Sequence, residues 1–245
     1  MNASVDALLE ARAARRWLSA LPAPSADWAA AYAIQDEVAR RLGPVTAWKV
    51  GAATPDSEPF RAPINAATVF EGVDRLPAAM FQVIGVEAEI AYRFARDLPP
   101  RAAPYTRAEV LDAVASVHPA FEIVDTRFAG FGSQDPLSHM ADQMSHGALV
   151  VGPAIADWRA LDPLAERVAL DVDGKTAIET VGGNSAGDPV RLLVWMANEG
   201  ARSFGGLHAG DVVTTGSCIG TVFVEPGSRS VARYGTMGTI ELTVA

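Results

Sequence analysis

The stretch Val83-Ile-Gly-Val-Glu-Ala-Glu-Ile-Ala-Tyr-Arg-Phe94 decides the fold of this 245-residue chain. Successive side chains of an extended strand point to opposite faces. One face therefore carries Glu87 and Glu89, whereas the other face is apolar or aromatic throughout. Two carboxylates side by side repel each other unless a cation, a proton or water compensates their charge. The stretch predicts a strand whose acidic face is either a metal site or an ordinary solvated sheet surface.

A third acid lies in the next predicted strand, which runs from Phe121 to Thr126. Glu122 has apolar neighbours on both faces of this strand, and a carboxylate in such surroundings is costly unless it is paired. Three carboxylates make an all-oxygen ligand set that suits Mg²⁺ or Mn²⁺. The spacing alone equally allows ordinary salt bridges, for which the candidate partners are Lys49, Arg93 and Arg127.

The composition excludes several classes of protein. A formal charge of -9 argues against nucleic acids and anionic membranes as partners, because both attract basic patches. No stretch approaches the roughly 20 apolar residues of a membrane span, and the first ten residues carry acids where a signal peptide has basic residues. The lone Cys218 cannot form an internal disulfide. We therefore expect a cytoplasmic protein.

The amino-terminal half predicts helices followed by short strands. Residues 5–18 and 27–42 have helical composition, and Asp27 is a suitable N-cap. Prolines and a glycine turn predict short strands joined by loops over residues 45–74. The capping box from Thr106 to Glu109 predicts a helix that ends near Val117. Residues 128–144 predict a long ordered loop before a strand over 147–151.

The carboxyl-terminal half predicts strands and one long helix. A hairpin is expected to turn at Asp173-Gly174. Asp188 as N-cap and Pro189 at the first helical position predict a helix to about Phe204. Gly and Pro turns then separate four predicted strands, over residues 211–215, 221–225, 230–234 and 239–244. These elements define an α+β protein with a β-rich body.

Two further side chains are candidates for chemistry. Lys49 stands in an apolar context before a tight turn, although a snorkelling surface lysine would give the same pattern. His146 is a candidate acid or base, although a hydrogen-bonded structural histidine is the commoner outcome. The stretch Thr214-Thr-Gly-Ser217 ends a predicted strand with hydroxyls and a glycine that lets backbone approach a ligand.

The segment Gly183-Asn-Ser-Ala-Gly187 matches the nucleophile elbow of serine hydrolases. In those enzymes an acid and then a histidine follow the serine. Here His208 precedes the nearest credible acid, Asp211. We therefore prefer a glycine-rich loop that leads into a helix.

An ordered series of segments resembles the fumarylacetoacetate hydrolase superfamily, and within it the 2-keto-4-pentenoate hydratase group. The likeness covers nearly the whole chain, and the series is far more specific than any one segment. The segments are Ala31-Tyr-Ala-Ile-Gln-Asp36, Trp48-Lys-Val-Gly51, Val86-Glu-Ala-Glu-Ile-Ala91, Arg96-Asp-Leu-Pro99, Pro119-Ala-Phe-Glu-Ile-Val-Asp125 and Gly210-Asp-Val-Val-Thr-Thr-Gly-Ser217.

The resemblance implies a fold and a site. It implies a β-rich, barrel-like roll with the amino-terminal helices packed outside, and a homo-oligomer that is a dimer or larger. We divide the chain into a helical and substrate-loop region, 1–75, and a metal-binding β-rich catalytic domain, 76–245, and expect the two to form one compact unit. The implied metal ligands are Glu87, Glu89 and Glu122, with Mg²⁺ or Mn²⁺ bound. The implied catalytic residue is Lys49. The candidates that hold or transfer protons are Asp142, Ser145, His146 or a metal-bound water, and the candidate substrate-binding residues are Gly51, Thr215, Gly216 and Ser217.

Two positions depart from the family pattern. Where the hydratases carry Asp-Asn-Ala-Ser-Ser-Gly, this chain reads Asp142-Gln-Met-Ser-His-Gly147, so His146 replaces a serine. The segment from Arg61 to Asn65 also lacks the acid that hydratases carry nearby. Both departures leave the group that transfers protons open.

The resemblance implies a metal-dependent hydratase that adds water to a 2-hydroxy-2,4-dienoate and forms a 4-hydroxy-2-oxo acid in the catabolism of aromatic compounds. Lys49 would neutralise the anionic end of the substrate. The alternatives are decarboxylation of an oxalocrotonate-like diacid and hydrolytic carbon-carbon cleavage of an acylpyruvate. An alternative of another class is a non-catalytic partner subunit of a related decarboxylase.

Overall fold

Strand β5 (Gly85–Phe94) lies in the middle of the larger of two sheets, as its apolar face requires. The computed structural model describes residues 2–245. The strand order of this sheet is β2-β1-β10-β5-β6-β7-β3, and β11 also pairs with β5. The bounds of the other strands are β1 Val45–Gly51, β2 Phe60–Asn65, β3 Val69–Glu71, β6 Val114–Val124, β7 His146–Val151, β10 Val212–Ser217 and β11 Val222–Phe223.

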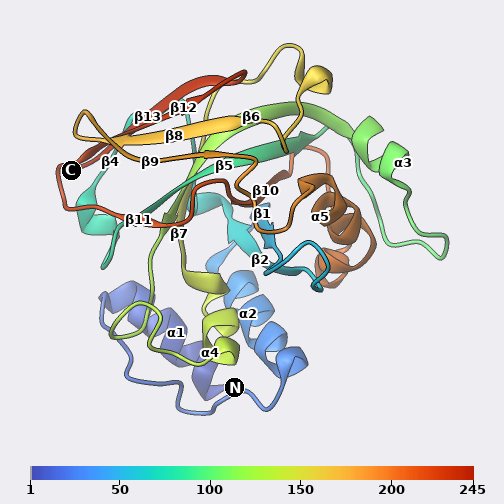
Figure 1. The fold of residues 1–245 in the computed structure, drawn as a ribbon. Coiled ribbons are helices and arrows are strands. Elements are labelled where there is room, and N and C mark those ends of the chain that lie inside the picture. The colour runs from blue at the N-terminus through green and yellow to red at the C-terminus, as the bar shows by residue number, and fades with distance from the viewer. Residues whose placement is uncertain (1) are drawn as a thin grey trace.

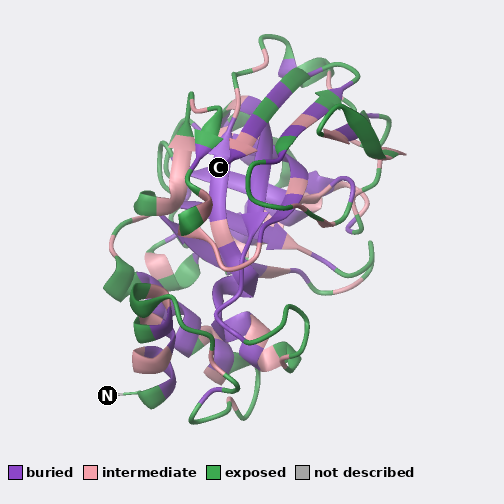
Figure 2. Ribbon diagram, turned by 90° about the vertical axis from the view of Figure 1, so that its left-hand side faces the viewer, coloured by how far each residue is buried: buried purple, intermediate pink, exposed green. Residues whose placement is uncertain are grey.

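The smaller sheet packs against the apolar face of the larger one (Figure 1). Its order is β4-β13-β12-β8-β9. Val86 and Ile90 of the first sheet share one buried cluster with Leu170 and Leu242 of the second, and the strands at the centre of the molecule are buried along most of their length (Figure 2). The bounds are β4 Arg75–Leu76, β8 Arg167–Val172, β9 Lys175–Val181, β12 Arg229–Tyr234 and β13 Gly238–Val244.

The amino-terminal helices form a separate layer on one side of the larger sheet (Figure 1). Helix α1 (Ala3–Ala14) and helix α2 (Trp28–Leu42) pack with the short helix α4 (Pro136–Ala141). The side chain of Asp27 accepts a hydrogen bond from the backbone N–H of Ala30, as expected of an N-cap. The amide of Gln35 donates to the backbone oxygen of Met140 (2.6 Å), so α2 and α4 are joined by a buried polar contact.

The remaining helices lie beside the sheets, apart from the amino-terminal layer (Figure 1). They are α3 (Arg107–Asp112) and α5 (Pro189–Trp195), which continues as a π-helical turn, Met196–Gly200, and a 3-10 turn, Arg202–Phe204. The predicted start at Asp188 is confirmed, because its side chain accepts from the N–H of Val190. Four further 3-10 turns are Ala66–Thr68, Ala78–Met80, Gln143–Ser145 and Trp158–Ala160, and of these Gln143–Ser145 has positive φ angles throughout.

Three predicted boundaries are wrong. The helix of the capping box ends at Asp112 instead of near Val117, because Val114 and Val117 pair with β5 and this packing outweighs the local helical preference. The predicted loop 128–144 contains α4, whose N-cap is Asp135. The first helix ends at Ala14 instead of near residue 18, since Arg15 adopts a left-handed conformation (φ 50°).

The predicted fold class is confirmed: the molecule is α+β, with a curled sheet and outlying amino-terminal helices. Strands β1 and β2 come from the predicted amino-terminal region, and both are hydrogen-bonded into the sheet that contains β5. The division at residue 75 stays a prediction. Within residues 2–245, no helix is both long and apolar enough to span a bilayer.

Candidate metal centre and cavity

The three acids predicted from the sequence lie together on two neighbouring strands. Glu87 of β5 is the direct cross-strand partner of Glu122 of β6, and Glu89 follows on the same face of β5. One carboxylate oxygen from each side chain lies within 4.8 Å of the other two. Glu89 and Glu122 are fully buried, and Glu87 is half-buried. The antiparallel register therefore places three acids around one point, as a cation site requires.

Hydroxyl and backbone donors orient the two acids of β5. Glu89 accepts from the hydroxyl of Thr214 and from the backbone N–H of Gly216 (3.0 Å). Glu87 accepts from the hydroxyl of Thr221. Gly216 has a φ of +89°, a conformation that favours glycine and that aims its N–H at the carboxylate. These hydrogen-bond donors thus fix the directions of the two carboxylates.

Lys49 is the cation of the site. Its ammonium donates to Oε1 of Glu122 (2.6 Å) and to the backbone oxygen of Met144 (3.0 Å). Lys49 is only 8% exposed, so the ammonium ends inside the protein and the snorkelling interpretation is wrong. Burial alone would lower the pKa of Lys49, but Glu122 and Glu87 outweigh this effect and raise the pKa above its ordinary value. The side chain is therefore charged at neutral pH.

The three acids differ in their pKa. Burial, together with the charge of Glu122, raises the pKa of Glu87, and it raises that of Glu89 far above the ordinary value. Burial would also raise the pKa of Glu122, but Lys49 and His146 outweigh it and lower the pKa. Glu122 is thus the ionised member, whereas Glu87 and Glu89 hold protons more tightly than free glutamates do.

The residues fit a divalent cation. Oε2 of Glu122 is buried and has no hydrogen-bond partner among the described residues. Burying a carboxylate oxygen without a partner is costly, and a cation between the three acids would remove this cost. Lys49 compensates the ionised Glu122, and a doubly charged ion would also stabilise the ionised forms of Glu87 and Glu89. Both salt-bridge candidates other than Lys49 are engaged elsewhere, Arg93 with Glu71 and Arg127 with Asp142.

A cavity of about 340 Å³ opens onto the three acids. Five of the predicted catalytic and substrate-binding residues line it: Lys49, Gly51, Ser145, Gly216 and Ser217. Thr215 does not line the cavity, and its hydroxyl donates to the backbone oxygen of Ile90 (3.0 Å) instead. Ser185 of the elbow-like segment lines the cavity and donates to the backbone oxygen of Ala52 (2.7 Å).

His146 lies behind the cavity wall. Its ring is buried between Glu122 and Thr68, with Nδ1 3.1 Å from Oε1 of the glutamate and Nε2 3.1 Å from the threonine hydroxyl. Burial lowers the pKa of His146 to about 4, although Glu122 opposes this effect. A neutral ring with a proton on Nδ1 donates to the carboxylate and fixes its direction.

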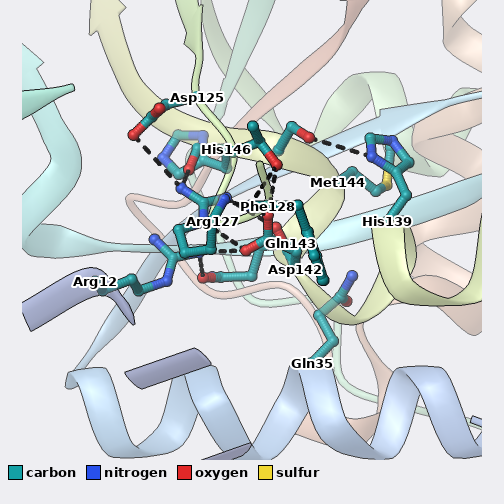
Figure 3. Close-up of polar contacts among 12 residues, drawn as sticks. Arg12, Gln35, Asp125, Arg127, Phe128, His139, Asp142, Gln143, Met144 and His146 are labelled. Atoms are coloured by element: carbon teal, nitrogen blue, oxygen red, sulfur yellow. Dashed lines mark hydrogen bonds and ion pairs between the residues drawn. The ribbon is translucent and has the colours of Figure 1, made fainter. Parts of the chain in front are cut away.

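Asp142 also lies behind the wall, in a buried polar network (Figure 3). Its carboxylate pairs with the guanidinium of Arg127 and accepts from the backbone N–H of the same residue (3.0 Å). Arg12 of α1 reaches the network from outside and donates to Oε1 of Gln143 (2.7 Å). Asp142 is thus an anchor for the segment that leads to Ser145.

Several residues at the site escaped the sequence analysis. His139 lines the cavity, and its Nδ1 lies 3.2 Å from the hydroxyl of Ser145. Phe60 and Phe131 also line the cavity. Thr221 had no signal in the sequence, because its distance from Glu87 depends on the short pairing of β11 with β5. The helix that carries His139 did have a signal in the sequence. Asp135-Pro136 is the same helix-start pattern as Asp188-Pro189.

Comparisons with known proteins agree with this fold. The fumarylacetoacetate (FAA) hydrolase C-terminal family matches residues 38–245. The chain is 29% identical over 253 residues to a 2-keto-4-pentenoate hydratase of Burkholderia vietnamiensis (strain G4 / LMG 22486), across 96% of this chain and 94% of the relative. It is 28% identical over 160 residues to a 4-oxalocrotonate decarboxylase of Pseudomonas sp, across 65% of this chain and 60% of the relative.

A solved structure shows the same fold over nearly the whole chain. The 4-oxalocrotonate decarboxylase from Pseudomonas putida G7, complexed with magnesium and adipate, superposes with a TM-score of 0.86 at 22% identity. The match covers 99% of this chain and 96% of that chain. The chain therefore belongs to the fumarylacetoacetate hydrolase family. It is an enzyme of that family, and its relatives include both hydratases and oxalocrotonate decarboxylases.

Proposed function

We propose that this enzyme is a divalent-metal-dependent hydratase that adds water to a 2-hydroxy-2,4-dienoate and forms a 4-hydroxy-2-oxo acid, in the catabolism of aromatic compounds. The near full-length similarity to a 2-keto-4-pentenoate hydratase supports the reaction class. A decarboxylase is the second candidate, because a solved decarboxylase shares the fold across almost all of the chain. The side chains that line the cavity support the choice of the hydratase.

Glu87, Glu89 and Glu122 would hold the metal, for which Mg²⁺ or Mn²⁺ suits the all-oxygen set. The magnesium in the solved relative supports this assignment. When bound, the ion supplies a Lewis acid that stabilises negative charge on the oxygen of a 2-oxo acid. Oε2 of Glu122 is buried and has no hydrogen-bond partner among the described residues, and such an ion would bind it.

Lys49 would bind the anionic end of the substrate. Its ammonium is charged, lies at the floor of the cavity and is held by two acceptors, so it needs no rearrangement to meet a carboxylate. A positioned cation in a site of low dielectric stabilises an anion more than it would in water. The same charge would oppose protonation of the substrate carboxylate.

Ser145 and His139 would hold the water or move its proton. Both side chains line the cavity and are hydrogen-bonded to each other. Burial, and after it the charge of Lys49, lowers the pKa of His139, so the ring is neutral at pH 7 and can accept a proton. In this proposal Asp142 and His146 serve to position other groups, because neither lines the cavity.

The lining of the cavity favours a substrate with a single carboxylate. It includes the apolar side chains of Phe60, Val124 and Phe131, and Lys49 is the only lysine or arginine among the described residues that line the cavity. Arg191 lies nearby, but its guanidinium donates to the backbone oxygens of Thr54 and Ser57. A second carboxylate at the far end of a diacid would meet apolar rings without a cation. This observation carries the choice of hydratase over decarboxylase.

A product analysis tests the proposal. The purified protein with Mg²⁺ is incubated separately with 2-hydroxypenta-2,4-dienoate, with the enol of 4-oxalocrotonate and with an acylpyruvate. We expect turnover of the dienoate, with a product that has gained one water. Release of carbon dioxide from the diacid, or of pyruvate from the acylpyruvate, would replace the proposal by the corresponding alternative. Binding of pyruvate without turnover of any of the three would indicate a non-catalytic subunit.

A further inference from the structure

Three consecutive residues without glycine adopt the left-handed conformation beside the cavity. The φ angles of Gln143, Met144 and Ser145 are 48°, 52° and 59°. Among the described residues only two other non-glycine positions have positive φ: Arg15 ends a helix, and Asp173 lies in a hairpin turn. Side chains with a Cβ disfavour this conformation, so a run of three persists only where the surroundings enforce it.

The left-handed turn presents two groups to the site. The backbone oxygen of Met144 accepts from the ammonium of Lys49 (3.0 Å), and Ser145 lines the cavity next to His139. Among the described residues, Lys49 has one other acceptor, Glu122. The direction in which the ammonium points is therefore set jointly by β6 and by this turn.

Two neighbouring arginines hold the turn (Figure 3). Arg127 brackets it, because its guanidinium donates to the backbone oxygen of Asp142 (3.0 Å) before the turn and to that of His146 (2.9 Å) after it. Arg12 of α1 holds the first residue of the turn, since its guanidinium donates to Oε1 of Gln143 (2.7 Å). The amide of Gln143 in turn donates to the backbone oxygen of Pro63 (2.7 Å) in β2.

Arg12 occupies an unfavourable place for a cation. Burial, with the like charge of Arg127, lowers its pKa to about 9, and its Nε is buried with no hydrogen-bond partner among the described residues. Its compensation comes from Gln143 and from the carboxylate of Asp142, 3.7 Å away. A helix that only covered the sheet would need no such residue. The segment that matches the family begins at residue 38, so Arg12 lies outside it.

We propose that Arg12 is a positioning residue: through Gln143 it holds the left-handed turn that aims Lys49 and Ser145 into the cavity. The amino-terminal helix α1 is then part of the catalytic apparatus as well as a covering layer. The kinetic part of this inference rests on the proposed function, whereas the structural part does not.

Arg12→Ala tests the inference, with Arg12→Lys as the conservative variant. Arg16→Ala is the matched control, because Arg16 follows the same helix but pairs with Glu10 on the surface. For Arg12→Ala we expect kcat to fall about 10-fold or more, since small displacements of positioned groups are costly, while KM and Mg²⁺ affinity change little. Arg12→Lys should recover part of kcat, and Arg16→Ala should match the wild type.

The second readout is independent of turnover. With ¹³C-methyl methionine, the Met144 methyl resonance, assigned with Met144→Leu, should move in Arg12→Ala and stay in place in Arg16→Ala. A folded Arg12→Ala protein with kcat within about twofold of wild type and an unmoved Met144 resonance would overturn the inference. Equal losses of kcat and Mg²⁺ affinity would overturn it as well, because they would indicate a general structural role. If the wild type turns over no substrate, the proposed function fails, and the Met144 resonance alone decides whether Arg12 holds the turn.

Discussion

The acidic face of β5 and β6 and the left-handed turn at Gln143–Ser145 meet at Lys49, but different forces hold them. The acids stand on regular strands whose backbone hydrogen bonds exist whatever the side chains are. The turn has an unfavourable backbone and depends on arginines from distant parts of the chain. The face should therefore survive changes in its side chains, whereas the turn should not survive the loss of its partners.

Glu89→Gln should have the largest effect on function and almost none on the fold. The amide can still accept from Thr214 and Gly216, but the site loses a negatively charged ligand. We expect activity to fall by ~10³-fold, which corresponds to several kcal/mol of transition-state stabilisation. Steady-state kinetics and Mg²⁺ titration calorimetry measure this loss, with Glu225→Gln as an exposed control. Unchanged turnover would remove Glu89 from the ligand set.

Lys49 contacts both regions, the acidic face through Glu122 and the turn through Met144. Lys49→Met should lower kcat/KM about 10²-fold, because it removes the cation that faces the substrate. It should also change the pH dependence of metal binding. Lys49 lowers the pKa of Glu122, so its removal should raise that pKa, and protons should compete more strongly with the metal as pH falls. The ratio of Mg²⁺ affinity at pH 8 to that at pH 6 should therefore be larger in the variant. Lys175→Met, in an exposed hairpin, is the control; if it equals Lys49→Met in both measurements, Lys49 has no special role.

Thr221→Val should have the smallest effect of the three. It removes the hydroxyl that orients Glu87 and leaves all three carboxylates in place. We expect Mg²⁺ binding to weaken about 10-fold, as for other partners of metal ligands, with kcat nearly unchanged at saturating metal. Titration calorimetry beside Thr239→Val, an exposed threonine of β13, measures the difference. A loss as large as that of Glu89→Gln would mean that Thr221 itself binds the metal.

Much of the fold could be predicted because its signals are local. Alternation along Val83–Phe94 gives both faces of β5, and Asp27 and Asp188 mark the starts of α2 and α5. The errors occur where tertiary pairing outweighs a local preference. The capping box predicts that Val114 is helical, but Val114 pairs with Phe94 in the sheet.

The site could be predicted only in part. Strand periodicity predicts the direction of the acidic side chains. Nothing local indicates that Gln143–Ser145 is left-handed, because the segment contains no glycine. One of the residues that hold it, Arg12, lies more than a hundred residues away in the sequence. The predicted homo-oligomer and the physiological metal also depend on information beyond local pattern, and both stay predictions.

Anomalous diffraction from crystals soaked in Mn²⁺ tests the central claim most directly. The account predicts one strong peak that is coordinated by carboxylate oxygens of Glu87, Glu89 and Glu122 and lies in the cavity beside Lys49. A peak elsewhere, or a peak that only one of these carboxylates touches, would contradict it.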